Sequence, residues 1–106
     1  MNEAKIKTLL GLAIRARKLA IGASAVDANL RKRAVHLILL ANDAGANTER
    51  KVRALLETLQ FKCPIIQYKT KDEIGAILNR TDVSVVGILD ENFAAGIAMH
   101  AKADEK

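Results

Sequence analysis

Aromatic residues, cysteine and proline are scarce in this chain of 106 residues, which has no tryptophan, one tyrosine, two phenylalanines, one proline and one cysteine. The single cysteine, Cys63, cannot form an intramolecular disulfide, which is typical of proteins in a reducing, intracellular compartment. The shortage of aromatic side chains argues against proteins that bind single strands by stacking bases on exposed rings. The core must instead be built from Ala, Leu, Ile and Val.

Long apolar runs are also missing. No run approaches the ~20 residues that span a bilayer, and the N-terminal stretch, which contains Lys5 and Lys7, lacks the uninterrupted apolar region of a signal peptide. We therefore expect a cytoplasmic protein without a membrane partner. Half of the residues are hydrophobic, which predicts one folded domain over residues 1–106, with residues 102–106 as a frayed tail.

The sequence contains no motif that is typical of catalysis or of cofactor binding. His36 and His100 are too isolated in sequence to predict a metal site, and the glycines form neither GxGxxG nor a P-loop. Cys63 has no histidine or acid near it in sequence, which is typical of a structural thiol. Without a nucleophile, a base and an oxyanion donor in one constellation, the sequence predicts a protein that is not an enzyme and holds no cofactor.

Positive charge is concentrated in the first half of the chain. Residues 1–53 contain eleven Lys and Arg and four Asp and Glu, a net charge of +7, whereas residues 54–106 contain six bases and eight acids, a net charge of −2. A basic half favours an anionic partner, and RNA, DNA and a membrane surface are all candidates. The alternative is a solvated cationic face without a partner.

Two helices are predicted at the start of the chain. Apolar residues at helical spacing indicate an amphipathic helix over residues 2–19, with Ala20 at the end of its apolar stripe. Gly22 then separates it from a second helix over residues 24–33. Ser24 and Asp27 resemble a capping box at the start of this second helix.

A short buried strand follows over residues 37–41, because this apolar run is too short for a separate helix. The polar pair Asn42-Asp43 and a turn of small residues come next, before a helix over residues 48–59 that Asn47 or Thr48 can cap. Polar side chains thus stand at the carboxyl end of a strand, where open α/β sheets often bind ligands.

Strands and helices continue to alternate in the second half. Strands are predicted over residues 65–68 and 83–89, and helices over residues 71–78, capped by Thr70 with Glu73, and from Asp90 to about residue 101. This alternation predicts an α/β fold, a three-layer α-β-α sandwich with a small mixed central sheet.

Several short motifs follow one another along nearly the whole chain: Leu9–Ala13, Arg17-Lys18, Gly22, Leu37–Ala41, Asp43-Ala44, Asn47-Thr48, Asp72–Gly75, Val83–Leu89 and Asp90–Ala94. In their order and spacing the chain resembles the kink-turn RNA-binding ribosomal proteins of the large subunit, and more closely their small bacterial YlxQ-like branch. The resemblance implies an α-β-α sandwich that binds structured RNA. It also implies that the helix after Gly22 enters a sharply bent duplex, and that a loop matching residues 79–83 covers an extruded base.

The chain departs from the family's RNA-reading motif, which usually runs Gly-x-Asn-Glu-x-x-Lys. Ser24 stands at the Asn position and keeps a hydrogen-bonding group. Ala25 and Ala28 stand at the Glu and Lys positions and keep neither the carboxylate nor the ammonium. These departures bear on kink-turn specificity and leave the fold and general RNA binding unaffected.

Together, the charge pattern and the resemblance indicate a non-enzymatic protein that recognises structured RNA, kink-turn-like or ribosomal, by its shape and phosphates. The partner is RNA without a DNA preference, and the chain is expected to be a monomer. The candidate RNA-binding residues are Arg17, Lys18, Gly22, Ala23, Ser24, Arg31, Lys32, Asn42, Arg80 and Thr81.

Some of these residues have a second interpretation. Ser24 can cap its helix as well as contact RNA, Arg31 and Lys32 can form a solvated helix end, and Arg17 can be ordinary surface charge. Asn42 and Asp43 can stabilise their turn, and a turn role suits Asp43 because its charge would repel phosphate. The alternative function is a protein–protein interaction module on the same scaffold, which has lost kink-turn specificity.

Overall fold

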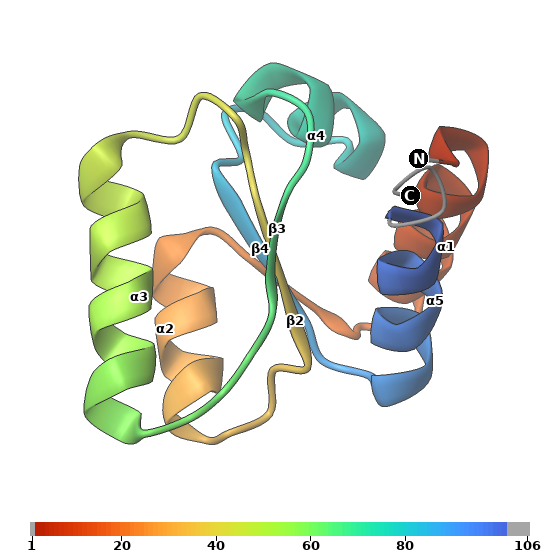
Figure 1. Cartoon of the computed structure of the whole chain (residues 1–106). Helices are drawn as coiled ribbons and strands as arrows, with labels where there is room; N and C mark the ends of the chain where they lie inside the picture. The colour runs from red at the N-terminus through yellow and green to blue at the C-terminus, as the bar shows by residue number, and fades with distance from the viewer. Residues whose placement is uncertain (1, 102–106) are drawn as a thin grey trace.

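The computed structural model describes residues 2–101, in which helices and strands alternate (Figure 1). The elements are α1 (Glu3–Arg15), β1 (Leu19–Ile21), α2 (Ala23–Arg31), β2 (Leu37–Leu40), α3 (Ala46–Leu59), β3 (Ile65–Gln67), α4 (Lys71–Leu78), β4 (Val85–Ile88) and α5 (Glu91–Ala101). The expected frayed tail, residues 102–106, lies outside the described residues. Within the described part, no helix combines the length and the apolar character needed to cross a membrane.

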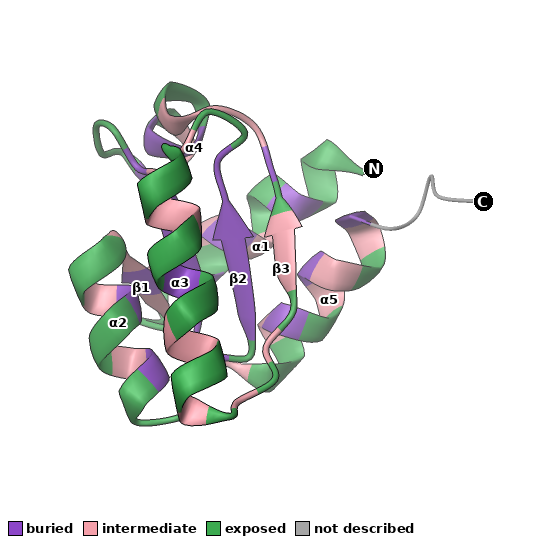
Figure 2. Cartoon of the chain, turned by 60° about the vertical axis from the view of Figure 1, so that its left-hand side comes forward, coloured by how far each residue is buried: buried purple, intermediate pink, exposed green. Residues whose placement is uncertain are grey.

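The four strands form one mixed sheet in the order β1-β4-β2-β3. β4 runs antiparallel to both of its neighbours, while β2 and β3 are parallel. Helices α2 and α3 cover one face of this sheet, and α1, α4 and α5 lie on the other side (Figures 1 and 2). The predicted three-layer α-β-α sandwich with a small mixed sheet is therefore confirmed.

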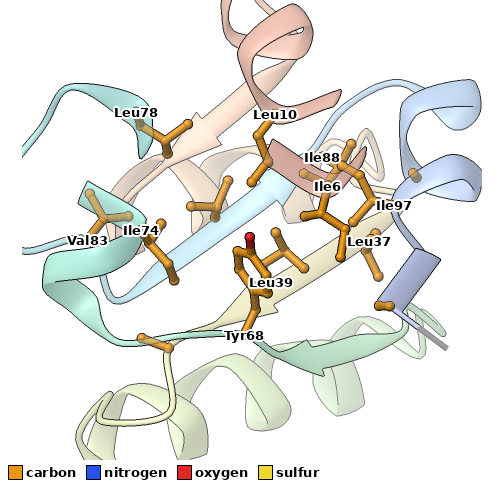
Figure 3. Packing of buried hydrophobic residues seen from close by; sticks show 14 residues of the cluster. Ile6, Leu10, Leu37, Leu39, Tyr68, Ile74, Leu78, Val83, Ile88 and Ile97 are labelled. Atoms are coloured by element: carbon orange, nitrogen blue, oxygen red, sulfur yellow. The ribbon is translucent and has the colours of Figure 1, made fainter. Parts of the chain in front are cut away.

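The core has two parts, one on each face of the sheet, and β2 and β4 contribute to both. All four residues of β2 are buried, because alternate side chains of a strand point to opposite faces and both faces are covered. Leu37 and Leu39 pack with α1, α4 and α5, whereas Ile38 and Leu40 pack with α2 and α3. As expected from the composition, these clusters are almost wholly aliphatic (Figure 3).

The prediction of one helix over residues 2–19 is wrong at its end. Helix α1 stops at Arg15, and Arg17 then adopts a left-handed conformation with φ of 60° while the Lys18 amide donates to Ala13 O at 2.9 Å. Residues 19–21 form strand β1, in which Ala20 pairs with Gly87 and is buried on the α2 side. Three residues are too few to show a strand period, so only pairing with the distant β4 reveals this strand.

The predicted helix caps were right at α4 and wrong at α2 and α3. Thr70 Oγ1 accepts from the Glu73 amide at 3.2 Å and the Thr70 amide donates to Glu73 Oε1 at 3.0 Å, a complete capping box. Helix α2 is instead preceded by Gly22 and α3 by Gly45, and neither start has a side-chain cap. These glycine starts leave the side chains of Ser24, Asn47 and Thr48 available for other contacts.

Smaller differences concern the ends of other elements. Helix α2 ends at Arg31 instead of residue 33, and β4 covers residues 85–88 instead of 83–89. Residues 83 and 84 belong to the loop that precedes β4, although Val83 is buried in the core as a strand residue would be. Apolar periodicity reports burial, and it does not report which backbone groups pair.

Candidate functional site

Three of the predicted site segments lie together at one edge of the sheet, each directly after or directly before a strand. β1, β2 and β3 all end here, and β4 begins here, because β4 alone runs in the opposite direction. Three backbone hydrogen bonds join the segments: Gly22 N to Val85 O at 2.9 Å, Ala41 N to Ser84 O at 2.8 Å and Asn42 N to Lys69 O at 2.7 Å. We call residues 22–24, 41–43 and 79–84 the carboxyl edge.

The start of helix α2 is the first component of the carboxyl edge. Gly22 has φ of 94° and ψ of 163°, a conformation that residues with a side chain rarely adopt, and no side chain caps the first turn. The exposed residues Ala23 and Ser24 follow directly. Uncapped N–H groups and the helix dipole make such a terminus attractive to anions.

The second component is the loop of residues 79–84, which is fastened to helix α4. The Arg80 amide donates to Gly75 O at 2.7 Å, and the Val83 amide donates to Lys71 O at 3.3 Å. Asn79 and Asp82 both have positive φ, of 58° and 55°. The loop therefore has a defined backbone path, and it leaves Arg80 and Thr81 exposed.

The turn after β2 is the third component. Asp43 Oδ1 accepts a hydrogen bond from the Lys71 amide at 2.8 Å, which ties this turn to the first residue of α4. This bond supports the structural interpretation of Asp43, although its partner lies in another element and not within the turn. Asn42 itself is exposed and makes a backbone bond to Lys69.

Lys69, beside the Asn42 turn, is engaged by acidic groups. Its Nζ lies 2.8 Å from Glu3 Oε1 and 4.0 Å from Glu73 Oε2. The hydrogen bond and the charge of Lys69 lower the pKa of Glu3, and the same hydrogen bond raises the pKa of Lys69. The Lys69 ammonium, two residues after β3, thus links α1 with α4, and its charge is balanced by these two carboxylates.

Four of the predicted basic residues lie away from the carboxyl edge. Arg17 and Lys18 precede β1, and Arg31 and Lys32 stand at the C-terminal end of α2, so both pairs lie at the opposite end of the sheet. Lys18 O accepts from the Leu89 amide at 2.8 Å, just after β4 ends. We call these four exposed residues the basic end; only Arg31 pairs with an acid among the described residues, Asp27, at 2.8 Å.

The structure thus divides the ten sequence-predicted site residues into two groups. Six lie on the carboxyl edge: Gly22, Ala23, Ser24, Asn42, Arg80 and Thr81. The other four form the basic end. Arg17 and Lys18 are separated from the carboxyl edge by the length of β1, and Arg31 and Lys32 by the length of α2. These four residues are close to Gly22 in sequence but far from it in space, because β1 and α2 each run from one end of the sheet to the other.

A pocket that the sequence analysis did not predict lies between α2 and α3. Its volume is about 160 Å³. Val26, Leu30, Val52 and Leu55 form its apolar wall, and the polar groups around it include Asn47, Thr48 and Lys51. The only signal in the sequence is the spacing of Thr48, Lys51 and Leu55, which places them on one face of a helix.

The motif positions that differ from the family pattern also have defined environments. Ala25 is half-buried and packs against the core under α2, whereas Ala28 is exposed. Among residues 2–101, no three or more His, Cys, Asp or Glu side chains are grouped so that they could hold a metal ion.

Two known proteins are similar to this chain over most of its length. The chain is 32% identical over 93 residues to the RNA-binding protein YlxQ of Enterococcus faecium, covering 88% of this chain and 87% of that protein. It is 34% identical over 86 residues to the RNA-binding protein YlxQ of Bacillus subtilis (strain 168), covering 81% and 84%.

A solved structure, that of a protein with unknown function from Bacillus halodurans C, superposes with a TM-score of 0.83 and 29% identity, covering 93% of this chain and 98% of that one. Residues 4–97 match the model of the ribosomal protein L7Ae/L30e/S12e/Gadd45 family. The expected resemblance is thereby confirmed, and the chain belongs to the ribosomal protein L7Ae/L30e/S12e/Gadd45 family.

Proposed function

We propose that this chain binds structured RNA at the carboxyl edge and catalyses no reaction. The observation that carries the proposal is the convergence of the α2 start, the Asn42 turn and the loop of residues 79–84 at one edge of the sheet. The family resemblance assigns RNA contact to two of these segments, the start of α2 and residues 79–83. Relatives that are named RNA-binding proteins and align with more than four-fifths of the chain support it.

Each part of the edge has a separate task in this mechanism. The N–H groups at the start of α2 and the Ser24 hydroxyl donate hydrogen bonds to phosphate or base edges. Arg80 supplies a charge to a neighbouring phosphate, and the loop around it covers an opened part of the RNA. Regular A-form duplexes hide their base edges in a narrow major groove, so bent or opened RNA suits such an edge.

The basic end adds phosphate contacts where the RNA is long enough to reach it. Helix α2 has nine residues, which correspond to about 14 Å. Arg17, Lys18 and Lys32 then strengthen binding through the release of counterions, without selecting a sequence. An RNA partner without a DNA preference, a monomeric chain and a cytoplasmic location complete the proposal.

A protein–protein interaction module is the second candidate function. It is favoured by Ala25 and Ala28, which remove a carboxylate and an ammonium from the start of α2 and leave small apolar side chains there. Co-purification with a protein after nuclease treatment would support it.

The test compares a kink-turn RNA with a straight duplex of equal length across a salt series. We expect tighter binding to the kink-turn, with an affinity that falls as salt rises. Equal and steeply salt-dependent binding to both would remove kink-turn recognition and leave a general basic surface. Absence of binding to either RNA near physiological salt would contradict the proposal and favour the protein partner.

A gain-of-function variant sharpens this test. Ala28 is exposed, so Ala28→Lys restores the family's ammonium without disturbing the core. We expect a higher kink-turn affinity and a salt slope steeper by about one unit. Ala95→Lys is the matched control, because Ala95 is an exposed helical alanine on α5; an equal gain from both variants would place the RNA elsewhere.

A further inference from the structure

The pocket between α2 and α3 has the size of one aromatic ring. Its volume is about 160 Å³, and an apolar protein cavity of ~150 Å³ is known to hold benzene. A single pyrimidine ring has about the size of benzene and therefore fits such a space. No aromatic side chain lines the pocket, so a ring inside it would contact aliphatic groups on its faces.

The pocket's inner wall is apolar and rigidly placed. Val26 and Leu30 of α2 are fully buried and Val52 of α3 is 7% exposed. All three belong to the core cluster on this face of the sheet. A wall made from packed core residues keeps its shape before a ligand arrives, which lowers the entropic cost of binding.

Hydrogen-bond donors are available where α3 borders the pocket. Asn47 Oδ1 already accepts from Arg50 at 2.9 Å, so its amide NH₂ is the group left to donate. Neither Thr48 nor Lys51 makes a side-chain hydrogen bond or ion pair within residues 2–101, although Asp27 on the α2 side is paired with Arg31. Donors suit the keto oxygens of a pyrimidine, and the Lys51 ammonium suits a phosphate.

The pocket adjoins the carboxyl edge. Ala23 is the first residue of α2 and belongs to both, and Asn47 and Thr48 lie in the first turn of α3. Helices α2 and α3 stand side by side on the same face of the sheet (Figures 1 and 2). Residues 79–83, which the resemblance assigns to covering an extruded base, do not line this pocket.

We propose that the pocket between α2 and α3 takes one extruded pyrimidine base of the bound RNA, in addition to any base under the loop of residues 79–84. The ring packs between the aliphatic side chains of α2 and α3. Asn47 and Thr48 donate to its polar edge, and Lys51 contacts the attached phosphate. This inference rests on the proposed RNA binding, and it names which unit of the RNA the pocket recognises.

The test uses a kink-turn RNA in which each unpaired nucleotide is replaced in turn by an abasic one. In the unmodified protein we expect one pyrimidine position whose loss weakens binding roughly threefold to tenfold, the worth of one or two hydrogen bonds. Leu55→Phe fills the pocket from its half-buried wall. In that variant, abasic replacement at this position should no longer weaken binding, because the base no longer enters the pocket.

Leu56→Phe is the matched control. Leu56 is also half-buried on α3, but it lines a different surface with Gln60 and Phe61. This variant should keep the penalty, and thermal unfolding of both variants shows that each is folded. A penalty that persists in Leu55→Phe, or no penalty at any pyrimidine position in the unmodified protein, would overturn the inference.

A second measurement separates failure of this inference from failure of RNA binding. NMR spectra are recorded while uridine monophosphate or adenosine monophosphate is added to the protein alone. Shifts at Ala23, Thr48 and Lys51 that occur only with the pyrimidine nucleotide would support pyrimidine binding in the pocket. If no RNA tested binds, the same shifts would identify a free nucleotide as the ligand of the pocket. RNA binding without such shifts and without an abasic penalty would leave the proposed function intact and refute the pyrimidine pocket.

Discussion

Gly22 and Gly75 are the two single residues on which the geometry of the carboxyl edge depends. Gly22 provides a φ of 94° that turns the chain from β1 into α2. A Cβ at Gly75 would lie 2.7 Å from Arg80 O, the carbonyl of the second residue in the loop of residues 79–84. The absence of a side chain at Gly75 therefore allows the loop to approach helix α4.

Gly75→Ala should be destabilising although alanine is the better helix former. The new methyl group forces the loop away from α4, and we expect a loss of about 1–3 kcal/mol in the free energy of unfolding. Gly11→Ala is the matched control, because Gly11 is also helical and its nearest contact, Arg15, is 4.0 Å away. That variant should gain about 0.5–1 kcal/mol; urea unfolding followed by circular dichroism measures both, and equal gains would contradict the close approach.

Tyr68 provides a second prediction for a single residue. Its ring is 1% exposed among aliphatic side chains (Figure 3), and its hydroxyl has no hydrogen-bond partner within the described residues. Tyr68→Phe removes an unsatisfied polar group and should raise the free energy of unfolding by about 1–3 kcal/mol. A loss of stability instead would show that the hydroxyl has a partner, such as a buried water.

The same hydroxyl makes stability depend on alkaline pH. Burial, with a smaller contribution from the charges of Glu3 and Glu73, raises the pKa of Tyr68 from 10.0 to about 12. Between these pH values the unfolded chain releases the proton and the folded chain keeps it, so stability falls as pH rises. Tyr68→Phe should remove this part of the fall between pH 10 and 12, measured by urea unfolding at each pH. Burial also raises the pKa of Cys63, to about 11, but this residue is present in both proteins and cancels in the comparison.

At the scale of elements, β1 and α2 decide which candidate residues share a surface. Both span the sheet from one end to the other, so residues a few positions apart in sequence reach opposite ends. Gly22 and Ser24 join the carboxyl edge, while Arg17 and Lys32 join the basic end. In the proposed function, specific recognition and general charge attraction therefore belong to different places.

RNA length should separate these two places. With a kink-turn RNA trimmed to its bent core, Arg80→Ala should weaken binding and Lys32→Ala should have little effect. With an added duplex arm, Lys32→Ala should lower the salt slope by about one unit, as expected for one lost phosphate contact. Binding titrations at several salt concentrations measure both slopes. If Lys32→Ala weakens binding to the short RNA as much as Arg80→Ala does, the two places act as one site.

At the scale of the whole molecule, the two core clusters are held together by shared strands. Val85 and Val86 are neighbours on β4 and both are fully buried, yet Val85 packs with α2 and α3 while Val86 packs with α1, α4 and α5. Neither layer of helices can keep its apolar face covered without the sheet. The described part of the chain should therefore unfold as one cooperative unit.

Val85→Ala and Val86→Ala test this cooperativity with the same substitution on opposite faces. Each should lower the free energy of unfolding by about 1–3 kcal/mol, the value for removing two buried carbons with partial collapse of the cavity. Urea unfolding is followed by circular dichroism, which reports all helices, and by the fluorescence of Tyr68. Both probes should give one coincident transition in each variant. Separate midpoints would show that the two layers unfold independently.

The sequence by itself determined the features that depend on neighbours along the chain. The buried run of β2, the amphipathic faces of the helices and the capping box at Thr70 were all predicted, because periodicity and capping involve residues only a few positions apart. The order and spacing of its motifs also identified the family, which the match over residues 4–97 confirms.

The tertiary structure decided everything that depends on pairing between distant segments. Strand β1 has only three residues and exists through its pairing with β4, so a local pattern could not reveal it. The division of the candidate site into a carboxyl edge and a basic end arises because β1 and α2 each run from one end of the sheet to the other. The pocket between α2 and α3 needs two helices at a fixed separation, which the core beneath them sets.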